Sequence, residues 1–269
     1  MEDLLVVENL TKTFKLSKKQ QRLEKEKTKV KIAVNDLSFT TKRGEIYGLL
    51  GPNGAGKTTT LRMLSTLIKP DSGEAYIMGY EITKNPTEVR NNIGFLTSDL
   101  KLEPHFTPNY LFDFFGNLQN VHADVIKERK DYLFNKFGIE EFKEVKVQNL
   151  STGMKQKVSL VISIVHNPEI IIFDEPTNGL DVITAKTVTD FLLELKSLGK
   201  TIILSTHIFS LVEKLCDRVG IIINGKMVAD DLLKNMTKDK SLEDYFFELY
   251  REHGDDDLWK ILWLLLKRN

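Results

Sequence analysis

The sequence predicts an α/β fold with a mainly parallel sheet and helices on both of its faces. Two observations carry this prediction. Apolar runs of strand length alternate with helical segments in the second half of the chain, and a glycine-rich loop joins an early apolar run to a helix. The 269 residues, 41% of them hydrophobic, suffice for one large domain or two small ones. The formal net charge is zero, so no overall field favours nucleic acid as a partner.

At the amino end we expect two strands, residues 4–7 and 33–40, that belong to an antiparallel β subdomain. Residues 17–31 between them hold seven Lys or Arg and two Glu. This composition is typical of a solvated, partly disordered insertion. Contact with anionic lipid headgroups or with a partner's cytoplasmic loops is the alternative.

A third strand, residues 46–50, leads into a glycine loop at 51–58 and a helix at 59–67. The loop reads Gly-Pro-Asn-Gly-Ala-Gly-Lys-Thr, which is the phosphate-binding pattern of P-loop NTPases. Its glycines let backbone N–H groups face phosphates, and the helix N-terminus adds partial positive charge. We expect Lys57 to reach the outer phosphates and Thr58 to contact Mg²⁺. The nucleotide-binding residues predicted here are Asn53, Gly54, Ala55, Gly56, Lys57, Thr58 and Thr59.

The middle of the chain changes character after a turn at 71–73 and a short strand at 93–96. Segments 110–118 and 125–137 carry apolar residues at helical spacing, and strand signals vanish. We therefore expect a helical subdomain, residues 99–167, inserted into the α/β domain.

The α/β pattern then resumes and ends in a hairpin. Asn224 and Gly225 form the predicted turn. Cys216, the single cysteine, lies in an apolar helical stripe and is expected to be a small buried core residue. The elements expected are strand 170–173, helix 184–198, strand 201–205, helix 209–215, strand 219–223 and strand 226–229.

Two acidic residues, Asp174 and Glu175, directly follow strand 170–173. A carboxylate at a strand tip beside a phosphate loop can hold Mg²⁺, usually through water. The next carboxylate can orient or deprotonate the attacking water. We expect Asp174 to be a metal ligand and Glu175 to be the catalytic base. The plainer alternative is an acidic turn after a strand.

A third motif, Leu-Ser-Thr-Gly-Met at 150–154, precedes a helical run at 155–166. Ser151 could simply cap that helix, and Gly153 leaves room for a phosphate near its N-terminus. With the other two motifs in this order, the chain resembles the ATP-binding subunits of ABC transporters over roughly residues 4–230. Within that family it resembles the bacterial branch of sodium-, drug- and peptide-export ATPases.

The resemblance adds residues to the expected site. It implies that Ser151 and Gly153 contact the ATP held by a second subunit and that Asp181 belongs to the nucleotide-binding set. It implies a γ-phosphate sensor at His207, for which helix capping is the alternative, and an adenine-stacking ring at Phe14, for which core filling is the alternative. Ser98 stands where the family has a metal-contacting Gln, so a bridging water would complete that contact.

The resemblance also implies the function and the partners. It implies an ATPase, with ATP and Mg²⁺ as cofactors, that powers the export of an ion, drug or peptide. The partners would be membrane-spanning permease subunits on separate chains and a second, identical ATPase subunit, at the cytoplasmic face of the membrane. Two alternatives stay open: a soluble ABC-type ATPase, and a nucleotide-gated switch with negligible hydrolysis. No apolar run reaches the ~20 residues that a membrane-spanning helix needs.

The end of the chain, residues 236–269, is expected to form a helical tail after a single ATPase domain at 1–235. Within it, three aspartates at 255–257 precede a stripe that is too apolar to stay free in water. Either the protein's own surface covers this stripe, or a partner subunit or membrane interface does. Its members at helical spacing, with the residues that widen it, are Leu258, Trp259, Ile261, Leu262, Trp263, Leu264, Leu265 and Leu266.

Overall fold

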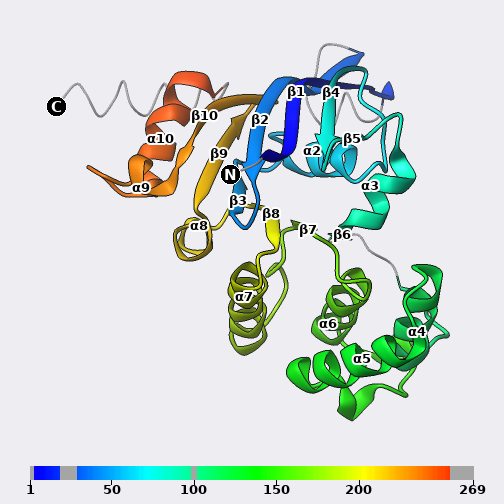
Figure 1. Ribbon diagram of the computed structural model, residues 1–269. Helices are drawn as coiled ribbons and strands as arrows, with labels where there is room; N and C mark the ends of the chain where they lie inside the picture. Colours follow the sequence, from blue (N-terminus) through cyan, green and yellow to red (C-terminus); the bar gives the residue numbers. More distant parts are fainter. Residues whose placement is uncertain (1–2, 19–28, 98–101, 255–269) are drawn as a thin grey trace.

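Two β-sheets and a group of helices make up the part of the chain that the computed structural model describes, residues 3–18, 29–97 and 102–254. In Figure 1 the two sheets lie above and helices α4 to α7 lie below. The expectations for Ser98, for most of the insertion at 17–31 and for the stripe at 258–266 fall outside the described residues.

The larger sheet has six strands in the order β10-β9-β3-β8-β7-β6. Five of them run parallel, and β10 pairs antiparallel with β9 across the predicted hairpin turn. The mainly parallel sheet is thus confirmed. Its strands are β3 (Ile46–Leu50), β6 (Ile93–Leu96), β7 (Ile170–Asp174), β8 (Thr201–Thr206), β9 (Arg218–Ile223) and β10 (Lys226–Leu232).

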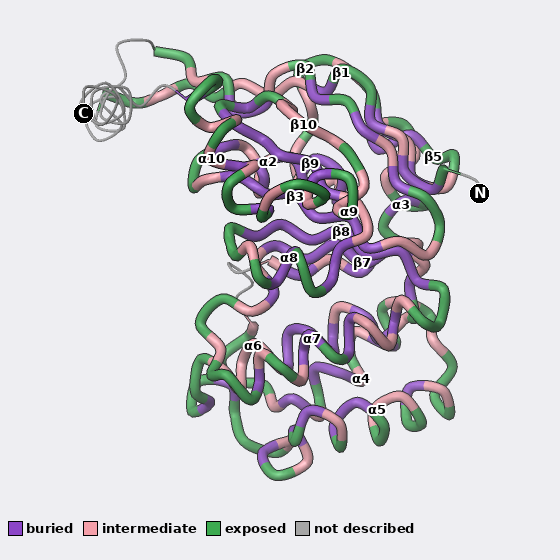
Figure 2. Tube along the Cα trace, turned by 90° about the vertical axis from the view of Figure 1, so that its left-hand side faces the viewer, coloured by how far each residue is buried: buried purple, intermediate pink, exposed green. Residues whose placement is uncertain are grey.

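Helices cover both faces of this sheet, as predicted. Successive side chains of a strand point to opposite faces, so Ile171 and Phe173 enter one apolar core while Ile170 and Ile172 enter another. The purple trace of β3, β7 and β8 in Figure 2 shows that these strands are buried throughout. The first core is closed by α6 (Thr152–Ser163), α7 (Val182–Ser197) and α8 (Phe209–Leu215), and the second by α2 (Lys57–Leu64) and α3 (Pro86–Asn92).

The second sheet is antiparallel, in the order β2-β1-β4-β5. Its buried residues, among them Leu5, Leu37 and Ala75, share the second core with Leu61 and Met63 of α2, so α2 lies between the two sheets. The expected antiparallel β subdomain is confirmed. β1 and β2 are longer than predicted, and β4 and β5 were not predicted; β4 begins at Ser72, inside the turn expected at 71–73. The strands are β1 (Asp3–Lys15), β2 (Val30–Lys42), β4 (Ser72–Ile77) and β5 (Tyr80–Glu81).

The helical subdomain is also confirmed over its described residues. α4 (Pro108–Leu118) begins where the Thr107 hydroxyl accepts a hydrogen bond from the N–H of Tyr110 at 3.2 Å. α5 (Ala123–Phe137) packs on it through Phe134, whose ring meets Phe112 edge-on at 5.4 Å. Two 3₁₀ turns, Glu140–Phe142 and Val147–Asn149, lead on to α6.

Five helices, α2, α4, α5, α6 and α7, begin two or three residues earlier than the sequence indicated. Two of these starts, those of α2 and α6, involve the motifs. α2 begins at Lys57 and ends at Leu64, before Thr66 takes up a left-handed backbone (φ 61°). α6 begins at Thr152, because the Ser151 hydroxyl accepts the N–H of Met154 and caps the helix there. Both starts place motif residues inside the first helical turn.

The end of the described chain adds two helices, α9 (Leu233–Met236) and α10 (Leu242–His253). Leu242 and Phe246 are buried, and α10 packs against α8 and β9. α10 lies within residues 236–269, for which the sequence predicts a helical tail, and the tail as a whole stays a prediction. Within the described ranges no helix is long and apolar enough to cross a membrane.

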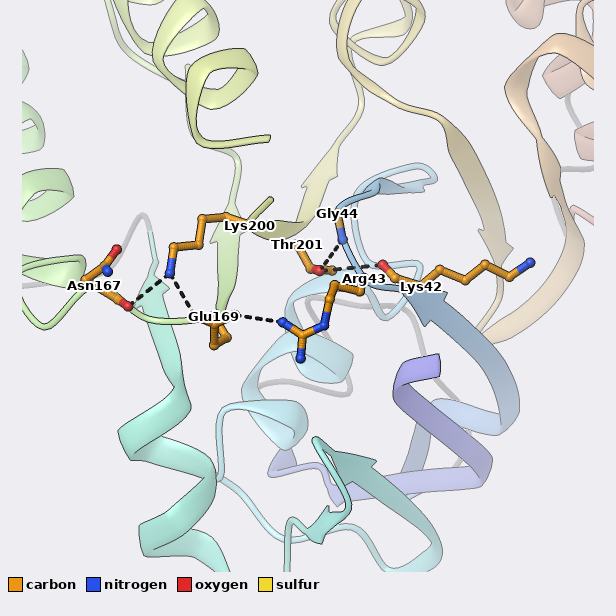
Figure 3. Close-up of polar contacts among 7 residues, drawn as sticks. All are labelled: Lys42, Arg43, Gly44, Asn167, Glu169, Lys200 and Thr201. Atoms are coloured by element: carbon orange, nitrogen blue, oxygen red, sulfur yellow. Dashed lines mark hydrogen bonds and ion pairs between the residues drawn. The ribbon is translucent and has the colours of Figure 1, made fainter. Parts of the chain in front are cut away.

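An ion-pair network joins the loops at the amino ends of three strands, at the sheet edge opposite the motif residues (Figure 3). The carboxylate of Glu169 accepts from Lys200 at 2.9 Å and from Arg43 at 2.8 Å. Beside it, the Thr201 hydroxyl accepts the N–H of Gly44 at 2.9 Å. These contacts connect the segments before β3, β7 and β8, and no sequence motif predicted them.

Candidate active site

Three neighbouring strands, β3, β8 and β7, end at one edge of the large sheet and carry the motifs there. The phosphate loop follows β3, Asp174 and Glu175 stand at the tip of β7, and His207 follows β8. The carboxyl edge of a parallel sheet is where α/β proteins bind their ligands. Motifs separated by more than 100 residues therefore meet at one place.

The phosphate loop has a backbone that only glycine can adopt at Gly56. Its φ is 110°, and a Cβ there would lie 2.3 Å from the carbonyl oxygen of Ala33. At Gly51 a Cβ would lie 2.3 Å from the carbonyl oxygen of Ile222. These two close approaches hold the loop against β2 and β9, and α2 begins immediately after it.

Lys57 lies folded over the loop. Its side chain is buried, and Nζ donates to the carbonyl oxygens of Gly51 at 2.6 Å and Pro52 at 3.1 Å. Burial lowers the pKa of Lys57, while the carboxylates of Glu175 and Asp174 oppose that shift. The buried ammonium would form stronger hydrogen bonds with an anionic acceptor than with these neutral carbonyls, because hydrogen bonds between two charged groups are shorter and stronger.

Thr58 and Asp174 present oxygen atoms to the same spot. The Thr58 hydroxyl lies 3.1 Å from Asp174 Oδ1, which also accepts the hydroxyl of Ser205. Oxygen donors of this kind suit Mg²⁺. Across residues 3–18, 29–97 and 102–254, no three His, Cys, Asp or Glu side chains gather as a metal-binding group. A metal at this spot would therefore need phosphate oxygens or waters to complete its ligands.

Glu175 and His207 are in direct contact. His207 Nδ1 lies 2.9 Å from Glu175 Oε1, and the Glu175 side chain is only 15% exposed. Glu175 has a left-handed backbone (φ 55°), an unfavourable state for a non-glycine residue that is concentrated at functional sites. No side chain caps α8, whose N-cap residue is Ile208, so the capping alternative for His207 is wrong.

A cavity of about 410 Å³ opens over the phosphate loop and runs to the end of β1. The loop residues 53–59 form one wall, Glu175 lies at its border, and Phe14 forms the far end. Phe14 is 40% exposed, so it does not fill the core. Opposite it in the β1–β2 register stands Lys31, which also lines the cavity. No motif indicated Lys31 as a site residue, although the pairing of two strands with known register would have placed it there.

Ser151, Gly153 and Asp181 lie elsewhere, and none of them lines this cavity. Ser151 caps α6, and a Cβ on Gly153 would meet no atom within 4 Å. Asp181 caps α7 by accepting the N–H groups of Ile183 and Thr184, each at 3.0 Å. The hydrogen bonds from Thr184 lower the pKa of Asp181 most. The chain's own site thus gathers every described site residue except these three.

A phosphate loop with its lysine, a hydroxyl and carboxylate for a metal, and a second carboxylate beside the phosphates define a nucleotide-hydrolysing P-loop protein. Residues 34–178 match the family model described as ABC transporter. The ABC transporter ATP-binding protein NatA of Bacillus subtilis (strain 168) is 38% identical over 220 residues, covering 81% of this chain and 89% of NatA.

Two further proteins are similar. The linearmycin resistance ATP-binding protein LnrL of Bacillus subtilis (strain 168) is 36% identical, over 74% of this chain and 64% of LnrL. A solved dimeric structure of a post-hydrolysis state of the ATP-binding cassette MJ0796, bound to ADP and Pi, shares the fold with a TM-score of 0.74. Its sequence is 25% identical, and the structural match covers 85% of this chain and 98% of the MJ0796 chain.

The chain therefore belongs to the ABC transporter family, as an ATP-binding and ATP-hydrolysing subunit of a membrane transporter. Subunits of this class dimerise and pair with transmembrane components. The predicted P-loop fold, ATPase activity and transporter role are confirmed. The alternatives of a soluble ATPase and a nucleotide-gated switch are not supported.

Proposed function

We propose that the chain hydrolyses Mg-ATP at the interface of a homodimer and thereby powers export through permease subunits on separate chains, at the cytoplasmic face of the membrane. The convergence of the phosphate loop, Asp174, Glu175 and His207 on three adjacent strand tips carries this proposal. Each residue's role follows from its place in that arrangement.

Phosphate binding falls to the loop. Lys57 would exchange the carbonyls of Gly51 and Pro52 for the β- and γ-phosphate oxygens, to which its ammonium binds more strongly. Loop N–H groups and the amino end of α2 add to the attraction. These groups explain why the cavity over residues 53–59 would bind an anionic ligand.

The Thr58 hydroxyl and Asp174 carboxylate would hold Mg²⁺, which neutralises phosphate charge when it is bound. Ser98, outside the described residues, would support it through a bridging water. The Ser205 hydroxyl, which donates to Asp174, holds that carboxylate in place whether or not the metal is there.

Glu175 would act as the general base for the water that attacks the γ-phosphate. Its carboxylate takes the proton that the water loses as the new bond from the water oxygen to the γ-phosphorus forms. The bond from the γ-phosphorus to the oxygen that bridges it to the β-phosphate breaks in the same displacement, and ADP leaves with that oxygen. An imidazole with its proton on Nδ1 donates to Glu175 Oε1 and so fixes the carboxylate in one orientation. To act as a γ-phosphate sensor as well, His207 must carry a proton on both ring nitrogens, so that Nε2–H donates to a γ-phosphate oxygen while Nδ1–H donates to Glu175.

At the far end of the cavity Phe14 would stack on the adenine ring. Lys31, its neighbour across the hairpin, would contact the ribose or the phosphates from that side. The cavity thus offers an aromatic face at one end and cations along its length, which matches the shape and charge of ATP.

The dimer would place Ser151 and Gly153 against the ATP of the second subunit, because the start of α6 is open at Gly153. Beside Asp181, Val182 and Ile183 are 86% and 80% exposed, an unusual state for two adjacent aliphatic side chains. A second copy bringing the same surface would cover them. The solved structure of the cassette MJ0796, which shares this fold, is a dimer, and this supports the proposal.

The direction of transport rests on the relatives. LnrL is named for linearmycin resistance, and export of a toxic compound is one way to confer resistance. The cargo proposed is accordingly an ion, a drug or a peptide, and its binding cavity would lie on the permease chains.

The testing experiment is reconstitution of the chain with the permease encoded beside it into vesicles. We expect Mg-ATP hydrolysis and outward cargo movement that are both lost in Glu175→Gln. Glu88→Gln, an exposed acid on α3, is the matched control and should keep both. Hydrolysis without any permease association, or transport that survives Glu175→Gln, would overturn the proposal.

A further inference from the structure

A second cavity, of about 280 Å³, lies where α10 meets the phosphate loop. It is separate from the nucleotide cavity: the two have no lining residue in common. β3, the phosphate loop, α8 and α10 form its walls. Their apolar members are Leu50, Pro52, Phe209, Phe246, Phe247 and Tyr250. His207 and Gly51 complete the lining, so one side of this cavity is the machinery of the nucleotide site itself.

The walls favour an apolar occupant over water. Phe209 packs against Phe246 at 5.2 Å and against Phe247 at 6.2 Å between ring centroids, so the rings form one aromatic surface. A space of this size would take about nine waters at ~30 Å³ each, but ordered waters need two or more polar partners. An aromatic or aliphatic side chain needs none and adds ring contacts.

The described part of the chain ends at Gly254, four residues after Tyr250 of the cavity wall. Gly254 is buried and its N–H donates to the carbonyl of Tyr250 at 2.8 Å, while Asn224 Nδ2 donates to the carbonyl of His253 at 3.1 Å. The chain is therefore anchored to the domain one helical turn past Tyr250, which lines the cavity.

Segment 255–269 continues from that anchor. Its 15 residues span about 22 Å as a helix or about 50 Å when extended. With either length the segment could reach back from Gly254 to the cavity, because Tyr250 of the cavity wall lies only one helical turn before Gly254. Its apolar residues recur at helical spacing and make one face.

We propose that segment 255–269 docks its apolar face on this cavity in its own chain and inserts a large side chain between α10 and the phosphate loop. The occupant is the protein's own segment because that segment starts at the rim, is long enough and is too apolar to stay in water. Docking there places segment 255–269 against Pro52 and the turn that holds His207, so the segment would stabilise the nucleotide site. This inference is independent of the direction of transport.

The test uses intrinsic fluorescence. The chain has two tryptophans, Trp259 and Trp263, and both lie in the segment, so the emission reports on the segment alone. In the purified full chain without membranes we expect blue-shifted emission and weak quenching by acrylamide. Phe247→Asp places an unpaired charge in the cavity wall and should shift the emission to the red and raise quenching several-fold.

Tyr245→Asp is the matched control, because Tyr245 is also a half-buried ring on α10 but does not line the cavity. It should leave the emission unchanged. A second variant, Leu262→Asp, places a charge on the apolar face of the segment and leaves the folded domain intact. It should expose the tryptophans as Phe247→Asp does.

Three results would overturn the inference. The first is fully exposed tryptophans in the purified chain, including the case in which they become protected only when anionic vesicles are added. The second is protection that falls on dilution, which would assign the segment to a second copy. The third is equal exposure in Tyr245→Asp and Phe247→Asp.

Discussion

In the proposed site, nucleotide binding should depend most on Lys57, because its buried ammonium is the cation of the phosphate loop. Lys57→Ala removes hydrogen bonds to charged phosphates, which contribute about 3 kcal/mol in all, so ATP affinity should fall about 100-fold. Titration calorimetry would measure the loss. Lys226→Ala, at an exposed lysine of β10, should bind ATP normally. Micromolar binding retained by Lys57→Ala would contradict the role.

We propose that Glu175 acts in hydrolysis rather than in binding. Glu175→Gln keeps the shape of the side chain and removes the base, so the rate should fall by about 10²-fold or more while ATP affinity holds. Single-turnover hydrolysis and equilibrium binding of ATP separate the two effects. The variant should also trap an ATP-bound dimer, visible by light scattering. A native rate would remove Glu175 from the chemistry.

Local sequence motifs predict which residues belong to the site, but they do not predict the contacts between those residues. The phosphate loop and the Asp174–Glu175 pair are contiguous motifs whose chemistry is carried by residue type and order. The contact of Glu175 with His207 joins residues 32 positions apart and depends on a strained backbone that no motif encodes. Lys31 depends in the same way on the register of β1 and β2, which several irregular pairings shift.

At the scale of elements, Glu169 stabilises the amino ends of the central strands through Lys200 and Arg43. The hydrogen bond from Lys200 is the main cause that holds the pKa of Glu169 below its usual 4.5. A carboxyl whose pKa is lower in the folded chain stabilises the fold above the unfolded pKa and loses that contribution as pH falls through the folded pKa.

We therefore expect Glu169→Gln to flatten the loss of stability below about pH 4.5, where the native contribution disappears. Near neutral pH the variant should be less stable by under about 1 kcal/mol, since the side chain is 38% exposed and water screens the pair. Urea midpoints against pH would show this. Glu243→Gln, at an exposed acid of α10, should follow the native curve.

Element centres were predictable and element ends were not. The fully buried, mostly apolar strands at 46–50, 170–173 and 201–205 appear within one residue of their expected bounds, because burial on both faces favours such runs. β1 extends to Lys15 through polar residues, since pairing with β2 rather than burial sustains it. Helix starts depend on single side chains, as Ser151 and Asp181 show by capping α6 and α7.

The dimer belongs to the scale of the whole molecule, and exposed Ile183 tests it. In a Glu175→Gln background, Ile183→Asp should leave the monomer folded and able to bind ATP but should abolish the ATP-dependent dimer, because a charge would be buried there without a partner. Leu198→Asp is the matched control, as Leu198 is 69% exposed at the other end of α7. If both variants lose the dimer alike, the proposed interface at Asp181 is wrong.

The final test concerns residues 255–269, whose location the sequence left open because an apolar stripe indicates that something covers it but not what. If the stripe docks on the second cavity, removal of the segment exposes that cavity to water. Burial of one large side chain contributes about 2 kcal/mol. At roughly 2–4 °C per kcal/mol for a domain of this size, the melting temperature should fall by about 4–8 °C while ATP still binds.

Scanning calorimetry of the purified chain without lipid measures this shift. Replacing the three aspartates at 255–257 by Asn keeps the apolar face and should leave the melting temperature near the native value. An unchanged melting temperature on truncation, together with loss of membrane or permease association, would assign the segment to the membrane or permease. The second cavity would then need another occupant.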